Sequence, residues 1–83
     1  MDKLRLTKAD HAREWLAKEI RIGNFARGAT LPPEQELAGR LGVSYMTIRK
    51  AVGALVDEGL LERVKGSGTF VRNEIPEQKV QKI

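Results

Sequence analysis

The sequence has 83 residues, which suffices for one small domain and leaves no room for a second core. It contains no cysteine, which excludes disulfides and thiolate metal sites, and no stretch approaches the roughly 20 apolar residues that span a bilayer. Fifteen Lys and Arg against eleven Asp and Glu give a net charge of +4, which is compatible with a polyanionic partner but does not identify one.

Residues 7–23 are predicted to form an amphipathic helix. Thr7 is a suitable N-cap, and Asp10 follows three residues later, as in a capping box. Gly23-Asn24 is expected to end the helix, because these two residues tolerate a left-handed backbone best. Three large apolar residues at helical spacing are expected to face the core, namely Trp15, Leu16 and Ile20.

The next segment, 25–33, is predicted to link two helices, and Thr30-Leu31 within it can form a very short strand. A second helix is predicted to begin at Pro33 or Glu34 and to be stopped early by Gly42. A third, longer helix follows, with Ser44 as its N-cap and Gly59 as its closing residue. Its apolar stripe comprises Ile48, Ala51, Val52, Leu55 and Val56.

After Gly59 the hydrophobic period changes from 3.6 to about 2. Residues 60–64 and 69–72 are predicted to be strands joined by the glycine-rich turn 65–68. From Asn73 onward the chain is polar and aperiodic, which predicts a tail or linker. We therefore divide the chain into a domain at 1–72 and a linker at 73–83. The expected fold is α+β: a small winged helix-turn-helix ordered helix, short strand, helix, recognition helix and two-stranded wing.

The third helix carries the argument for function. Its buried stripe leaves polar and cationic side chains on the opposite side of its first turns, a set that suits phosphates and base edges in a major groove. The glycine-rich turn is narrow enough to lie along a minor groove. The residues that we predict at the DNA from these two elements are Ser44, Tyr45, Met46, Thr47, Arg49, Lys50, Lys65, Gly66, Ser67 and Gly68.

In order along the chain, the segments 31–38, 41–51, 58–60 and 66–71 resemble the N-terminal domain of GntR-type bacterial transcription regulators. The resemblance implies a cytoplasmic, homodimeric regulator, such as a repressor, that binds a pseudo-palindromic double-stranded operator. It further implies a C-terminal domain that binds a small effector. The chain ends at Ile83, so we expect that domain to be absent from this fragment. The segment 49–55 is similar to members whose effector domain resembles sugar-binding proteins, and 78–83 is a candidate lead-in to its first strand.

Three positions depart from the family pattern. The family usually places Ser or Thr where Pro33 stands, and proline cannot cap the second helix with its side chain. It often places a guanine-reading arginine where Gln35 and Tyr45 stand. We include Gln35 among the predicted DNA contacts, and we expect less dependence on guanine at the bases that these two residues reach.

Other interpretations remain open for several residues. Tyr45 can instead stack on the hairpin, Met46 can be an ordinary exposed side chain, and the wing glycines can serve only the turn. His11 is expected at the surface, and no histidine is placed beside a serine, so we expect no enzyme, no cofactor and no metal. Two other functions stay open: a protein-interaction module, and binding to an anionic membrane, which short helices of mixed charge do not favour.

Overall fold

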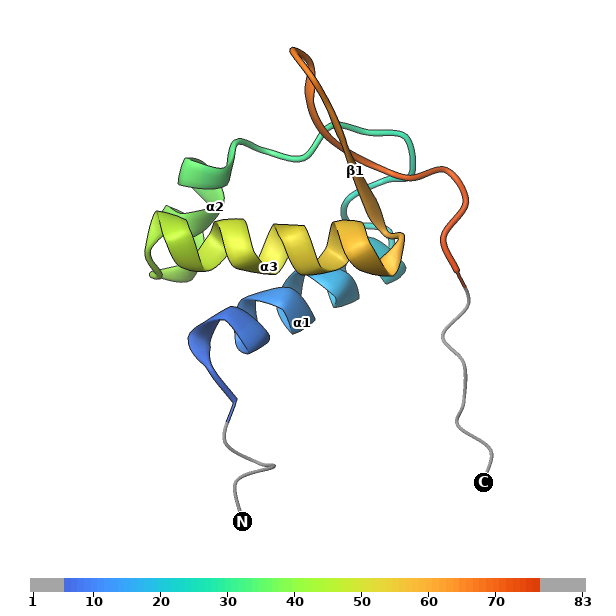
Figure 1. Cartoon of the computed structure of the whole chain (residues 1–83). Coiled ribbons are helices and arrows are strands. Elements are labelled where there is room, and N and C mark those ends of the chain that lie inside the picture. Colours follow the sequence, from blue (N-terminus) through green and yellow to red (C-terminus); the bar gives the residue numbers. More distant parts are fainter. Residues whose placement is uncertain (1–5, 77–83) are drawn as a thin grey trace, which may run out of the picture.

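The computed structural model describes residues 6–76. Three helices precede one hairpin, and their bounds are α1 (Lys8–Arg21), α2 (Glu34–Leu41), α3 (Tyr45–Glu58), β1 (Leu61–Val64) and β2 (Gly68–Val71). α3 lies across the middle of the domain, with α1 against it, and α2 lies beside its first turns (Figure 1). The hairpin rises from the far end of α3, and its tip projects away from the helices. This is the predicted winged helix-turn-helix.

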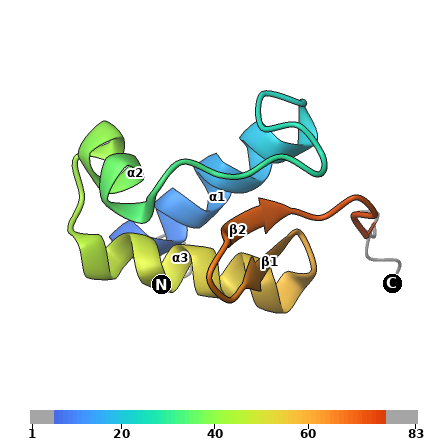
Figure 2. The ribbon, with the colours of Figure 1, turned by 90° about the horizontal axis from the view of Figure 1, so that it is seen from above.

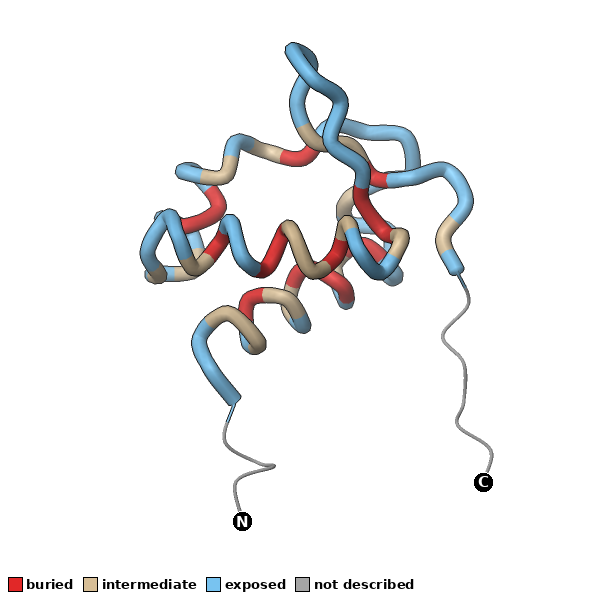
Figure 3. Tube along the Cα trace, viewed as in Figure 1, coloured by how far each residue is buried: buried red, intermediate tan, exposed pale blue. Residues whose placement is uncertain are grey.

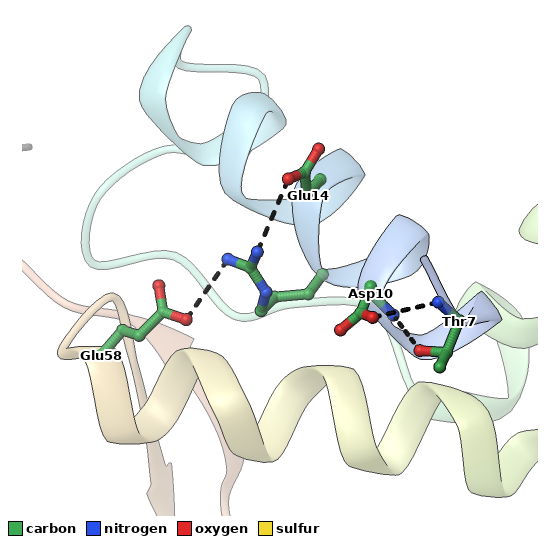
Figure 4. Close-up of polar contacts among 5 residues, drawn as sticks. Thr7, Asp10, Glu14 and Glu58 are labelled. Carbon is green, nitrogen blue, oxygen red and sulfur yellow. Dashed lines mark hydrogen bonds and ion pairs between the residues drawn. The ribbon is translucent and has the colours of Figure 1, made fainter. Parts of the chain in front are cut away.

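The capping box predicted for α1 is present (Figure 4). The Thr7 hydroxyl accepts a hydrogen bond from the Asp10 backbone N–H at 3.0 Å, and the Asp10 carboxylate accepts one from the Thr7 backbone N–H at 3.0 Å. The pKa of Asp10 is lowered, first by the hydrogen bond that the Thr7 backbone N–H donates to its carboxylate and then by the Thr7 side chain. The helix ends two residues earlier than predicted, at Arg21, and Gly23 takes the left-handed backbone at φ +90°.

The core lies mainly between α1 and α3, and the hairpin base closes it (Figure 3). Most of the apolar residues predicted to face the core are fully buried, among them Leu16, Ile20, Ile48, Val52 and Leu55. Two of them, Trp15 and Val56, are only half-buried, and Trp15 meets Phe25 edge to face with 6.1 Å between ring centroids. Helical spacing places Trp15 on the right face, but so large a ring at the edge of that face keeps one side in water.

The turn between α2 and α3 is built as predicted. α2 starts after Pro33, which makes no side-chain cap bond, and ends at Gly42, whose φ of +68° requires a left-handed backbone. Ser44 caps α3 by accepting the Thr47 backbone N–H at 3.1 Å. Gly59 ends α3 in the left-handed region at φ +88°.

The hairpin is antiparallel, with Leu61 opposite Val71 and Val64 opposite Gly68. β1 begins one residue later than predicted, because the Leu60 N–H still bonds back to Leu55 in the last turn of α3. β2 begins and ends one residue earlier than predicted. The expected short strand at Thr30-Leu31 is a single bridge, in which Thr30 pairs with Phe70.

Backbone hydrogen bonds extend this bridge along β2 and define a segment that we call the connector, 28–31. The Gly28 N–H donates to the Val71 carbonyl at 2.8 Å, and the Val71 N–H donates to the Ala29 carbonyl at 2.9 Å. The Leu31 N–H donates to the Thr69 carbonyl at 2.8 Å. The connector therefore pairs with the free edge of β2 and fixes the base of the wing against the helices (Figure 2).

The start of the predicted linker follows the domain surface. Ile75 is half-buried against the core, and the ring of Pro76 lies over Gly59, 3.1 Å from where a Cβ on that glycine would stand. The domain boundary near residue 72 remains a prediction, and the candidate lead-in at 78–83 lies outside the described residues. Among residues 6–76 no helix has the length and apolar content needed to cross a membrane.

Candidate nucleic-acid interface

One open groove of about 750 Å³ separates the start of α2 and the start of α3 from the wing. Its lining combines the connector end, the first residues of α2, two residues of α3 and the wing tip. The polar and charged residues among them are Thr30, Glu34, Gln35, Tyr45, Arg49, Arg63, Lys65, Ser67 and Thr69. Elements far apart in sequence thus share one concave surface that opens to solvent.

The groove brings together seven of the eleven residues that the sequence predicted at the DNA. Those in its lining are Gln35, Tyr45, Arg49, Lys65, Gly66, Ser67 and Gly68. The remaining four belong to the start of α3 outside the groove lining, and they are Ser44, Met46, Thr47 and Lys50. The predicted set therefore divides into a groove-lining group and a group on the outer surface of the same helix end.

Two of these four residues, Ser44 and Thr47, use their hydroxyls in hydrogen bonds within the domain. The Ser44 hydroxyl accepts the Thr47 N–H and also donates to the Thr47 hydroxyl oxygen at 2.9 Å. Thr47 is half-buried. The hydroxyls therefore hold the first turn of α3, whereas Met46, which is 64% exposed, and Lys50 are free to meet a ligand.

Tyr45 contacts Arg49, four residues later on α3. The Arg49 guanidinium donates to the Tyr45 hydroxyl at 3.4 Å, and its carbon lies 5.9 Å from the centre of the Tyr45 ring. The pKa of Arg49 is raised, first by this hydrogen bond and then by the charges of Tyr45 and Glu34. Arg49 thus remains a cation beside an aromatic ring, with its side chain half exposed.

Glu34 is the functional candidate that the sequence interpretation missed. Its side chain is 16% exposed, and its carboxylate has Oε1 3.5 Å from the Arg49 guanidinium and Oε2 3.1 Å from that of Arg63. Arg63 was not among the predicted residues either. Strand alternation signals its direction, because Leu61, two residues earlier on β1, is buried and side chains two apart share a face.

The wing tip carries charge with little bulk. Gly66 and Gly68 have φ values of +80° and +116°, which other residues adopt only with strain. A Cβ at Gly66 would meet nothing within 4 Å, so backbone conformation and not crowding requires glycine there. Among the residues that the structure describes, no three His, Asp or Glu side chains gather as metal ligands.

Comparison with known proteins places these features in a family. The family described as "Bacterial regulatory proteins, gntR family" matches residues 8–71. The repressor NagR of Bacillus subtilis is 46% identical over 82% of this chain and 28% of its own length. The mannosyl-D-glycerate system repressor MngR of Escherichia coli is 41% identical over 80% of this chain and 26% of its own length.

Solved structures agree with the sequence comparison. The DNA-binding domain of AraR, crystallised in complex with operator ORE1, superimposes with a TM-score of 0.75 and 44% identity, covering 80% of each chain. The chain described here spans only about a quarter of the length of the curated relatives it matches.

Proposed function

The chain belongs to the gntR family of bacterial regulatory proteins and is a winged helix-turn-helix DNA-binding domain, and from that premise we propose that it reads one specific duplex sequence for a cytoplasmic transcription regulator. In this proposal α3 enters the major groove with its first turns, and the wing tip lies in an adjacent minor groove. The side chains of Gln35 and Tyr45 reach base edges, while Arg49, Lys50 and Lys65 contact phosphates or bases.

A single observation carries the proposal: the start of α3 and the wing tip border the same groove, and both expose cations beside it. A duplex is the polyanion whose two grooves match a helix and a narrow turn held side by side. The likeness to an AraR domain that was crystallised with its operator supports duplex DNA as the partner.

The remaining parts of the proposal concern the longer protein. We infer that two copies bind a pseudo-palindromic operator as a homodimer and that a small metabolite, such as a sugar, controls them from a C-terminal domain. The names of two relatives support control by such a metabolite, because MngR is named for a mannosyl-D-glycerate system and both NagR and MngR are named as repressors. Repression by this protein is proposed on the same ground.

The test begins with the 83-residue chain and a random duplex pool, from which bound sequences are selected. The dissociation constant of the selected duplex is then measured by fluorescence anisotropy in Arg49→Ala and in Arg40→Ala. Arg40 is the matched control, because it is an exposed cation that pairs with Glu36 on α2 and does not line the groove. We expect weaker binding in Arg49→Ala alone, with a salt slope reduced by about one if Arg49 contacts a phosphate.

Equal binding by the two variants would remove Arg49 from the interface. A wild-type chain that shows no salt-dependent duplex binding would contradict the proposal as a whole and favour a protein-interaction module. Co-sedimentation with anionic liposomes then separates the membrane alternative, which predicts pelleting in the absence of DNA.

A further inference from the structure

The position of Glu34 runs against simple electrostatics. An interface for DNA gains affinity from cations, and a carboxylate in it repels phosphates. Yet Glu34 is the one acidic residue among the described residues that line the groove, and its side chain is mostly buried there. Its role must therefore lie in what it does to its neighbours.

Those neighbours are two arginines from different elements. Oε1 of Glu34 faces Arg49 on α3 and Oε2 faces Arg63 on β1, so one carboxylate bridges the recognition helix and the wing. Each guanidinium has five N–H donors and gives only one nitrogen to Glu34, so most donors stay available to a ligand. The carboxylate thus fixes the direction of both arginines and offsets part of their charge.

Fixing the arginines and reducing their charge affects binding to arbitrary duplex and binding to the operator differently. Binding to arbitrary duplex comes almost entirely from phosphate contacts, which mobile cations make most freely. Reading a base edge requires a side chain held in one geometry. Restraining and partly neutralising Arg49 and Arg63 therefore weakens the first kind of binding more than the second.

We propose that Glu34 is a specificity-determining residue, whose carboxylate keeps Arg49 and Arg63 from binding phosphates indiscriminately and so widens the gap between the operator and other sequences. This inference rests on the proposed function, because it concerns how the same groove chooses among duplexes. It assigns the effect to positioning and charge, with no requirement that Glu34 touch the DNA.

The test is Glu34→Gln, which keeps the size of the side chain and removes its charge. Glu36→Gln is the matched control, because it makes the same change in net charge two residues along α2, on a side chain that pairs with Arg40 outside the groove. Dissociation constants are measured for the selected duplex and for a scrambled duplex of equal length across a salt series. Thermal unfolding followed by circular dichroism checks that each variant is folded.

We expect Glu34→Gln to bind the scrambled duplex about eightfold more tightly at ~0.1 M salt for each arginine that turns to a phosphate, with a slope steeper by about 0.9. The affinity ratio of selected to scrambled duplex should fall accordingly, while Glu36→Gln keeps a ratio close to wild type. Adding Arg49→Ala and Arg63→Ala to Glu34→Gln should abolish the effect, since Glu34 is proposed to act through them.

Outcomes that contradict the inference are distinct from failure of the proposed function. If the wild-type chain prefers the selected duplex and Glu34→Gln keeps the same ratio and slope, Glu34 sets no specificity although DNA binding stands. If Glu36→Gln lowers the ratio equally, net charge alone is responsible. If Glu34→Gln does not fold, Glu34→Asp replaces it: the shorter carboxylate reaches the arginines less well, and an unchanged ratio there would also overturn the inference.

Discussion

The two sides of α3 are built on opposite principles. Toward α1 the helix presents Ile48, Val52 and Leu55, all fully buried. Toward the groove it presents Tyr45 and Arg49, which are exposed. The charge of Arg49 is balanced by Glu34 of α2. Figure 3 shows the contrast, with buried residues concentrated between α1 and α3 and exposed ones along the hairpin.

The difference separates stability from recognition within a domain of only 83 residues. Polar contacts on the α1 side lie at its margin, where Arg13 reaches Glu58 of α3 at 3.3 Å and Glu14 at 3.6 Å (Figure 4). Exposed pairs of this kind contribute about 0–1 kcal/mol. Apolar burial therefore supports the fold on one side, and charge arrangement determines the partner on the other.

The largest expected effect comes from a cavity on the α1 side. Leu16→Ala should lower the free energy of unfolding by about 2–5 kcal/mol, because it removes three buried carbons from a fully buried position. Denaturant titration measures this loss. Affinity for duplex per folded molecule should be unchanged, and the milder Ile48→Val, with a cost of about 0.5–1.5 kcal/mol, serves where Leu16→Ala leaves too little folded protein. A change in duplex affinity per folded molecule would show that stability and recognition are not separate on the two sides of α3.

The next effect lies on the groove side. Converting both Gln35 and Tyr45 to Arg should shift preference toward G·C pairs by about 1–3 kcal/mol for each good bidentate contact. It should also raise non-specific affinity, because two cations are added. Selection from one random pool with the original and the double variant is the comparison to make. Identical preferences at every position would show that neither residue reads bases.

A charge reversal at Lys65 tests whether the DNA-binding surface extends from α3 to the wing tip. Lys65→Glu should weaken duplex binding and reduce the salt slope by about one or more, since a cation is replaced by an anion at the tip. Lys18→Glu makes the same reversal on the exposed face of α1, away from the groove. Equal affinities of the two folded variants would mean that the wing does not lie at the DNA.

The smallest effect concerns acid. The folded state lowers the pKa of Asp10, so its contribution to stability is complete above the unfolded value near 3.8 and is lost as pH falls through the lower folded value. Unfolding temperature should therefore decline in that window, and less so in Asp10→Asn, which cannot titrate. Equal declines in both proteins would assign acid sensitivity to other groups. Duplex affinity at neutral pH should be the same in both.

Local chemistry made much of this fold predictable. Thr7 with Asp10, Ser44 before α3, and the glycines at 42 and 59 each satisfy backbone groups within a few residues, and the structure has all of them in place. Gln35 and Tyr45 were expected at the interface because the resembling family often places arginine there, and both line the groove. Their contacts with DNA remain predictions.

What the sequence did not reveal depends on contacts across long separations. The ion pair of Glu34 with Arg63 joins residues 29 positions apart, and no pattern within one helix or strand reports it. The pairing of the connector with β2 is similar, because the effect of Pro32 on Leu31 predicted a short extended segment and not its partner. The partial exposure of Trp15 depends on where Phe25 lies, which is a property of the assembled fold.

The connector adds backbone hydrogen bonds to the strands of the wing and not to its tip, which matters for redesign. The hairpin is effectively three-stranded along most of β2, since Gly28, Ala29 and Leu31 bond to it, and beyond the Val64–Gly68 pair only the turn at 65–67 remains. Amide hydrogens of Gly28, Leu31 and Val71 should therefore exchange with solvent only when the domain opens. The turn at 65–67 can accept grafted sequences from other proteins, whereas a deletion in the connector would remove the third strand from the edge of β2.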